Sequence, residues 1–465
     1  MKKILLVEPA YRNKYPPLAL MKISTYHKRM GDEVFFCRGK KSELKKCCWD
    51  RIYISTLFTF HWKIVIETIK YYKKSVVKTS DIICGGVLAT VLGEELKEET
   101  GVTVISGLLD EPGILDNNDI IIDTLPPDYS IIDTSENEFL SYEYPVKDSY
   151  IAYATRGCVR RCKFCAVPSI EPCFGPYIDI KEQVNYIKDN YGEKKHLLLL
   201  DNNVLASDRF DDIIDDIKQL GYAKGATYKR ILGNGRTSTS KKYVDFNQGI
   251  DARLLTREKC MKLAEIAIRP LRIAFDSADE KSVSLYKEKA AMAAECGIEH
   301  LSNYILFNYE DTPEELYMRL EINLELNEYF ESVGNKARIW SFPMKYSPIK
   351  GEHCFDRKYI GEHWNKKYLR GVHCILNATH GMVGPKKAYF HIAFGESVEE
   401  FMEILSMPER YVIERKKSAD KGLTAEWRKI FSELSADSCE YDYIMNGNLR
   451  EIPLEFKQSL RHYIM

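Results

Sequence analysis

The chain has 465 residues, 45% of them hydrophobic and 29% charged, which is enough for two or three domains with hydrophobic cores. The formal net charge of −1 gives no overall attraction to nucleic acid or to an anionic membrane. No apolar run reaches the ~20 residues that span a bilayer, and the apolar part of the amino terminus is too short for a signal peptide. The thirteen cysteines are an odd number and are scattered apart from one triplet, so we expect a reducing, cytoplasmic location.

Residues 1–125 alternate short apolar segments with amphipathic ones. Strands are expected at Lys3–Val7, Glu33–Cys37, Arg51–Ser55, Asp81–Cys84, Val102–Ser106 and Asp119–Asp123. Helices are expected from Pro16-Pro17 to Gly31, over Trp62–Lys74, and from Gly85-Gly86 through Leu96. This alternation predicts an α/β fold with a doubly wound parallel sheet, whose ligands lie beyond the carboxyl ends of the strands.

A second β-α series is expected after a linker. Residues 126–148 are polar, contain proline and lack periodicity, so they are assigned to the linker. In the domain 149–345, strands are expected at Tyr150–Thr155, His196–Asp201, Val244–Gly249, Leu271–Ser277, Leu301–Asn308 and Ala337–Met344. Helices are expected between them, over Asp179–Asn190, Asp208–Leu220, Thr256–Ile268, Glu280–Cys296 and Thr312–Phe330. Residues that act on a ligand are expected at the carboxyl ends of these strands.

The region 346–465 loses the strand–helix alternation. Short helical segments are expected at Val398–Leu405, Thr424–Leu434 and Leu454–Ile464. We interpret the region as a mostly helical carboxy-terminal subdomain that covers the second domain.

A cysteine triplet follows the first strand of the second series. Cys158, Cys162 and Cys165 have the spacing C-x3-C-x2-C, with no fourth cysteine at ligand distance in the same loop. Three thiolates can hold three irons of a [4Fe–4S] cluster and leave the fourth iron open to a small molecule. The alternative is a zinc knuckle that a remote Cys or His completes.

This spacing, with the aromatic Phe164 before the last cysteine, resembles the radical S-adenosylmethionine (SAM) superfamily. The resemblance implies a partial (β/α)6 barrel, three cluster-ligating cysteines and an adenine contact at Phe164. It implies reductive cleavage of SAM to a 5′-deoxyadenosyl radical that modifies a substrate, with a reduced flavodoxin or ferredoxin as electron donor. No feature of the sequence identifies that substrate.

The amino-terminal sheet, with its Pro-Pro-Leu-Ala-Leu entry to the first helix, resembles the cobalamin-binding domain found in a subclass of this superfamily. The D-x-H-x-x-G loop that supplies a cobalt ligand elsewhere is absent. Two interpretations therefore stay open: a cobalamin site, with cobalamin-dependent methylation, or a structural or substrate-binding sheet.

Polar side chains at the strand ends are the candidate SAM contacts: Asp201, Asn202, Gln248, Asp251, Arg253, Asp276 and Asn308. Asp201 and Asn202 stand where the family has a glycine-rich motif that grips the SAM amine, and Asn308 stands where relatives contact adenine. Arg253 is a candidate bidentate partner of the SAM carboxylate. Its alternative role is to bridge an acid at a helix start that Thr256 caps.

Two further features have competing interpretations. The stretch from Gly221 to Lys242 is basic and contains Tyr222 and Tyr228, which suits contacts to phosphates or bases but also a solvated insertion. A zinc- or cluster-stabilised module that holds nucleic acid through this stretch is the alternative to an enzyme. An auxiliary metal site or hydrogen-atom donor is the less common explanation for Cys354, His373 and Cys374, with His353 and His380 nearby.

Overall fold

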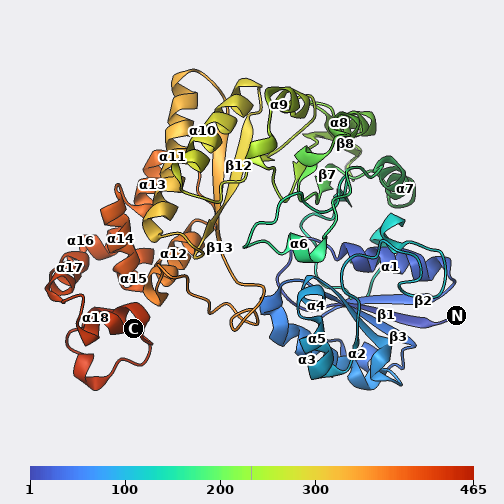
Figure 1. The fold of residues 1–465 in the computed structure, drawn as a ribbon, viewed down its shortest axis with the longest axis horizontal. Coiled ribbons are helices and arrows are strands. Elements are labelled where there is room, and N and C mark those ends of the chain that lie inside the picture. Colours follow the sequence, from blue (N-terminus) through green and yellow to red (C-terminus); the bar gives the residue numbers. More distant parts are fainter. Residues whose placement is uncertain (232, 465) are drawn as a thin grey trace. The chain divides into compact units, whose positions relative to one another are not determined.

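The computed structural model describes residues 1–231 and 233–464 and has a mixed α/β fold (Figure 1). The chain forms two compact units. The first unit holds residues 1–270 and 347–359, and the second holds residues 271–346 and 360–465. Within the described ranges, no helix has both the length and the apolar character needed to cross a membrane. The domain boundaries expected at 125, 148 and 345 stay predictions.

A parallel sheet occupies the amino-terminal part of the first unit, as predicted, but it has five strands where six were expected (Figure 1). Its strands are β1 (Lys3–Glu8), β2 (Glu33–Arg38), β3 (Arg51–Thr56), β4 (Ile82–Gly86) and β5 (Thr103–Val104). Their order is β2-β1-β3-β4-β5. Because consecutive crossovers leave β1 in opposite directions, the switch point of this sheet lies between β1 and β3.

Helices cover both faces of this sheet (Figure 1). They are α1 (Leu18–Arg29), α2 (Ser42–Lys45), α3 (Trp62–Tyr72), α4 (Val87–Val91) and α5 (Gly93–Thr100). On the face of α3 and α5, Leu5 and Ile52 pack with Val65, Ile69 and Leu96 in one buried cluster. Burial on both faces explains the continuous apolar strands, because each such side chain contributes about 1.5–3 kcal/mol when removed from water.

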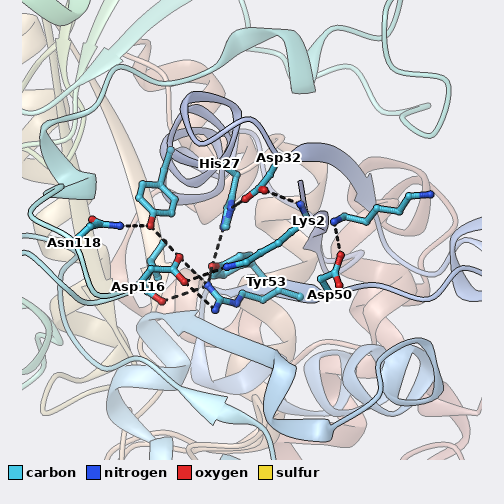
Figure 2. Close-up of polar contacts among 11 residues, drawn as sticks. Lys2, His27, Asp32, Asp50, Tyr53, Asp116 and Asn118 are labelled. Carbon is cyan, nitrogen blue, oxygen red and sulfur yellow. Dashed lines mark hydrogen bonds and ion pairs between the residues drawn. The ribbon is translucent and has the colours of Figure 1, made fainter.

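A polar network lies beneath α1 near the amino ends of β1 and β3 (Figure 2). His27, at 0% exposure, binds Asp32 through Nδ1 at 2.8 Å and the Tyr53 hydroxyl through Nε2 at 2.9 Å. Arg51 donates to the same hydroxyl at 2.9 Å and to Asp116 at 3.2 Å. Burial, which outweighs the opposing effect of Asp32, lowers the pKa of His27. Both ring nitrogens are satisfied at the edge remote from the expected ligand side, so the network is structural.

Two expectations for this region were wrong in detail. Asp119–Asp123 is not a strand; the chain forms a 3₁₀ helix at Ile122–Thr124 instead. The Asn118 side chain accepts a hydrogen bond from Ile120 N at 3.0 Å, which turns the backbone away from an extended path. Ile122 is then buried without a partner strand. The fifth strand is also shorter than the expected Val102–Ser106.

The rest of the first unit contains a three-stranded parallel sheet of order β10-β7-β6. Its strands are β6 (Ser149–Ala152), β7 (His196–Leu199) and β10 (Val244–Phe246). The accompanying helices are α6 (Val167–Ile170), α7 (Lys181–Tyr191), α8 (Phe210–Ile217) and α9 (Arg257–Leu263). The basic stretch forms a separate antiparallel hairpin of β8 (Thr227–Ile231) and β9 (Thr237–Lys241).

The second unit begins with another parallel sheet, of order β11-β12-β13. Its strands are β11 (Leu271–Arg272), β12 (His300–Phe307) and β13 (Arg338–Lys345), with helices α10 (Glu280–Glu295) and α11 (Pro313–Ser332). All six expected strands of the second series are therefore present, as two three-stranded sheets that each follow chain order.

The carboxy-terminal helices pack on α11 through a single apolar cluster that includes Leu320, Phe401 and Trp427. The helices are α12 (Lys366–Ala378), α13 (Lys387–Phe394), α14 (Val398–Ser406), α15 (Glu409–Ile413), α16 (Arg415–Asp420), α17 (Leu423–Glu433) and α18 (Cys439–Asn446). The expected helical segment Leu454–Ile464 is two short 3₁₀ helices, Leu454–Phe456 and Arg461–Tyr463. Few of its side chains are buried, so packing does not extend the helix.

Candidate functional site

The cysteine loop leaves the carboxyl end of β6 and returns to it. Arg156 and Gly175 exchange backbone hydrogen bonds of 3.0 and 2.9 Å, which closes the loop at its base. Gly157, the residue before Cys158, has φ 73°. A Cβ at this position would lie 2.2 Å from the carbonyl oxygen of Cys173, so only glycine allows this close backbone approach.

Glu171 anchors the loop from within, and the sequence analysis missed it. Its buried carboxylate accepts hydrogen bonds from the backbone N–H of Gly157 and from Asn202 Nδ2, the latter at 2.9 Å. It also forms an ion pair of 3.4 Å with Arg156. No spacing rule marks an acid that follows a four-residue helix, so the sequence carried no signal for this role.

Arg156 completes the base of the loop. Its guanidinium lies 3.3 Å from Asp123 and 4.0 Å from the centroid of the Tyr153 ring. The two carboxylates of Asp123 and Glu171 therefore share one half-buried cation, and the arrangement joins the 3₁₀ helix Ile122–Thr124 to the cysteine loop. A buried charge that is paired in this way is costly to disturb.

Asp201 fastens the start of the loop to the end of β7. It is completely buried, and its carboxylate accepts hydrogen bonds from the backbone of Ala154 at 3.2 Å and from the Thr155 hydroxyl at 2.7 Å. Burial raises the pKa of Asp201 to about 6, although these hydrogen bonds oppose the shift. The structure thus gives Asp201 a positioning role; contact with SAM stays a prediction.

The three thiols are half-buried, and none of them is in a disulfide. Cys158 Sγ accepts hydrogen bonds from Arg160 N at 3.3 Å and from Asn203 Nδ2 at 3.4 Å. A hydrogen bond joins Arg253 to Cys162. N–H donors and a guanidinium beside sulfur stabilise the negative charge of a metal-bound cysteine. Phe164 is half-buried between the second and third cysteines in the chain.

The donor set fits an iron–sulfur cluster in its chemistry, because three cysteine thiols on one loop, none of them in a disulfide, meet N–H donors and a guanidinium. The side chains are not gathered around one point: among residues 1–231 and 233–464, no group of three His, Cys, Asp or Glu could hold a metal ion as placed. The same finding gives no fourth ligand to the zinc alternative within these ranges.

Asn203 is the polar residue at this strand end that lies closest to the motif. It is 1% exposed, and while its Nδ2 donates to Cys158, its Oδ1 has no hydrogen-bond partner within the described part of the chain. A buried acceptor without a donor costs about 1–3 kcal/mol. Asn202, which the sequence analysis preferred, is instead committed to Glu171.

The segment after β10 contains the next predicted contacts. Arg253 Nε lies 2.6 Å from Asp251, and Arg160 Nε lies 2.8 Å from the same carboxylate. Burial would raise the pKa of Asp251, but hydrogen bonds from these two guanidinium groups hold it below its ordinary value. The Thr256 side chain caps α9, so the alternative role of Arg253 as a bridge to an acid is present. Gln248 is exposed, and its contact with SAM, like that of Arg253, stays a prediction.

The other two predicted contacts belong to the second unit. Asp276 is exposed beyond the end of β11. Asn308 is completely buried with φ 67°, and its amide accepts from Gly361 N at 2.8 Å and donates to Tyr346 O at 3.4 Å. Asn308 therefore organises the chain within its own unit; its contact with adenine stays a prediction.

The proposed auxiliary site gains no support from the described residues. Cys354 lies in the segment 347–359 of the first unit, whereas His373 and Cys374 lie on α12 of the second. Cys374 is part of the apolar cluster around α11. Core packing therefore accounts for the cysteine at position 374.

At the carboxyl edge of the five-stranded sheet, the chain's own aromatic side chains lie at the switch point. Tyr11, which follows β1, stacks on His61, which follows β3, with ring centroids 4.6 Å apart and planes 3° apart. The ring centroids of Phe60 and His61 are 4.7 Å apart, and the guanidinium carbon of Arg357 lies 4.1 Å from the centroid of the Phe60 ring. These groups fill the edge and do not fit a corrin ring, so we derive no step through cobalamin.

The sequence matches no protein-family model, and no curated protein is similar to it. The function is therefore argued from the residues themselves.

Proposed function

We propose that the chain is a radical SAM enzyme. The observation that carries the proposal is the cysteine loop: a C-x3-C-x2-C motif, with none of its thiols in a disulfide, directly after the first strand of a β-α series. The loop base is held by Glu171 and by Asp201 at the next strand end. The chain order of the strands within both three-stranded sheets supports a partial (β/α)6 barrel, and the five-stranded order supports a cobalamin-binding-like domain.

In this proposal Cys158, Cys162 and Cys165 hold a [4Fe–4S] cluster. When bound, the cluster would supply one electron for cleavage of the C5′–S bond of SAM, which gives methionine and a 5′-deoxyadenosyl radical. The protein's own groups set the electrostatics of the loop. The N–H donors of Arg160 and Asn203 stabilise negative charge on Cys158, and Arg253 does so on Cys162.

Binding of the SAM amino group is assigned to Asn203 rather than to Asn202. The Asn203 Oδ1 atom is a buried acceptor that lacks a donor within the described residues, and its own Nδ2 already contacts Cys158. An ammonium donor beside the motif would satisfy this atom. A reduced flavodoxin or ferredoxin in the cytoplasm remains the proposed electron source.

Anaerobic reconstitution with iron and sulfide tests the proposal. We expect four irons per chain, as the [4Fe–4S] assignment requires, a brown protein, and release of 5′-deoxyadenosine from SAM under dithionite. Cys162→Ala should lose both colour and deoxyadenosine. Cys173→Ala is the matched control, because Cys173 is an exposed cysteine of the same loop and should keep both. A colourless zinc protein that does not cleave SAM would refute the proposal.

A further inference from the structure

The hairpin β8–β9 projects from the first unit as a separate two-stranded element. Most of its side chains are exposed, including Ile231 at 76%. An isolated hairpin is marginally stable in water, so its position depends on its base. There Lys224 N donates to Glu265 O at 2.7 Å, Lys242 N donates to Ala226 O at 2.9 Å, and the Tyr228 hydroxyl donates to Glu193 O at 3.3 Å.

The charged side chains of this hairpin are all positive. Residues 224–242 contain six cations and no acid: Lys224, Lys229, Arg230, Arg236, Lys241 and Lys242. Lys242 is buried and pairs with Glu193 at 2.7 Å. Lys229, Arg230, Arg236 and Lys241 are exposed and form no ion pair with the described residues.

Four uncompensated cations on one small element attract a polyanion locally, even though the chain as a whole carries a charge of −1. The remaining exposed side chains of the strands are mainly hydroxyls, from Thr227, Thr237, Ser238 and Thr239. Hydroxyls, lysine and arginine are the side chains that contact phosphate and ribose oxygens.

A polar cavity of about 250 Å³ adjoins the base of the hairpin. Its lining includes Tyr150, Lys181, Asn185, Lys188, Gln219 and Lys242. Lys242 directly follows β9, and Glu193, which also lines the cavity, accepts from the hairpin residue Tyr228. The two amides supply the donor and acceptor pairs that base edges require. Lys181 pairs with Asp216 at 2.6 Å, whereas Lys188 forms no ion pair with the described residues and suits phosphate.

We propose that the hairpin 224–242 and the adjoining cavity bind single-stranded RNA, with phosphates along the hairpin and one unstacked base in the cavity. Duplex nucleic acid keeps its bases stacked and has none to place in a cavity, whereas single-stranded RNA offers both free bases and 2′-hydroxyl groups. This binding goes beyond the proposed SAM chemistry and does not depend on it.

Fluorescence anisotropy with the full-length protein tests the hairpin. The probe is a labelled, mixed-sequence single-stranded RNA of about 16 nucleotides. Changing Lys229, Arg230, Arg236 and Lys241 together to Ser should weaken binding at least tenfold. It should also reduce the slope of log K against log salt by about 3, since each phosphate contact on a single strand contributes about 0.7.

The matched control removes the same charge from the same unit, at exposed lysines far from the hairpin in sequence. Lys46, Lys63, Lys73 and Lys74 changed together to Ser should leave the affinity within a factor of two. If both variants lost the same RNA affinity, the effect would come from net charge alone and the proposal would be refuted. An unchanged affinity in the hairpin variant would refute it as well.

The cavity is tested with Asn185→Ala and Gln219→Ala, both at solvent-exposed helical positions. We expect each to weaken RNA binding severalfold without changing the salt slope, because an amide contributes no charge. Duplex DNA or polyglutamate that binds as tightly as the RNA would overturn the assignment, in favour of a duplex or an acidic protein partner. None of these measurements requires iron or SAM, so their outcome is separate from that of the proposed reaction.

Discussion

The carboxylate of Glu171 accepts a hydrogen bond from the backbone N–H of Gly157, immediately before the first cysteine of the motif. The same carboxylate binds Asn202, so the end of β7 and the start of the cysteine loop share one anchor. The loop is thus positioned by residues that are not themselves candidate ligands.

Gly157→Ala should destabilise the protein by about 3–5 kcal/mol, the range of the most damaging substitutions. The added Cβ would lie 2.2 Å from a backbone oxygen that cannot move without opening the loop base. Gly101→Ala is the control: Gly101 also has positive φ, but its nearest neighbour would be a side-chain methyl at 3.8 Å. We expect it to cost about 1 kcal/mol in urea unfolding. Similar costs for both would contradict the packing of the loop.

Glu171→Gln should cost about 3–5 kcal/mol, because it removes the buried carboxylate that pairs with Arg156 and places an amide against Gly157 N–H. Glu143→Gln, in an exposed pair with Lys147, should cost under about 1 kcal/mol. Chemical unfolding of both variants measures the difference. An unchanged free energy of unfolding in Glu171→Gln would show that the carboxylate does not anchor the loop.

Because of Asp201, the free energy of unfolding should decrease as the pH rises. Its folded pKa of about 6 lies above the ordinary 3.8, so its protonated form contributes stability that is complete below pH 3.8 and is lost as the pH rises through about 6. The difference corresponds to about 3 kcal/mol. Relative to Asp201→Asn, which does not titrate, the wild type should lose up to that amount across this window. The exposed variant Asp189→Asn should show no such trend; a flat difference for Asp201→Asn would disprove the shift.

Asn203→Leu should make the reduction potential of a reconstituted cluster more negative. The substitution removes an N–H donor at Cys158 and leaves the negative charge on sulfur less stabilised. A redox titration followed by electron paramagnetic resonance measures the potential, with the exposed Asn190→Leu as control. A shift in the positive direction would contradict the role of Asn203.

Hydroxocobalamin should not bind. Tyr11, Phe60 and His61 fill the carboxyl edge of the five-stranded sheet with their own ring contacts. Protein incubated with the cofactor and then desalted should carry no corrinoid absorbance. A retained corrinoid spectrum would show that these rings move aside.

Most secondary structure followed from local pattern. The apolar runs of β1 and β3, the Pro-Pro entry to α1 and the capping signal Thr312-Pro313 all act over a few residues, and each predicted its element. Ile122 and the segment Leu454–Ile464 were predicted wrongly, because an Asn118 side-chain hydrogen bond and sparse packing decided their conformation. Strand pairing could be predicted from the sequence only where strands that are consecutive in the chain are also neighbours in the sheet.

The sequence by itself determined the spacing of the three cysteines, their place after a strand, and the parallel character of the amino-terminal sheet, although not its number of strands. Only the tertiary structure decided that Glu171 and Asp201 hold the loop, that Arg253 pairs with Asp251, and that Asn203 rather than Asn202 reaches Cys158. The physical reason is the distance along the chain over which each kind of interaction acts. Spacing and periodicity act through neighbouring residues, whereas a buried carboxylate finds its partners wherever the packing of distant strand ends places them.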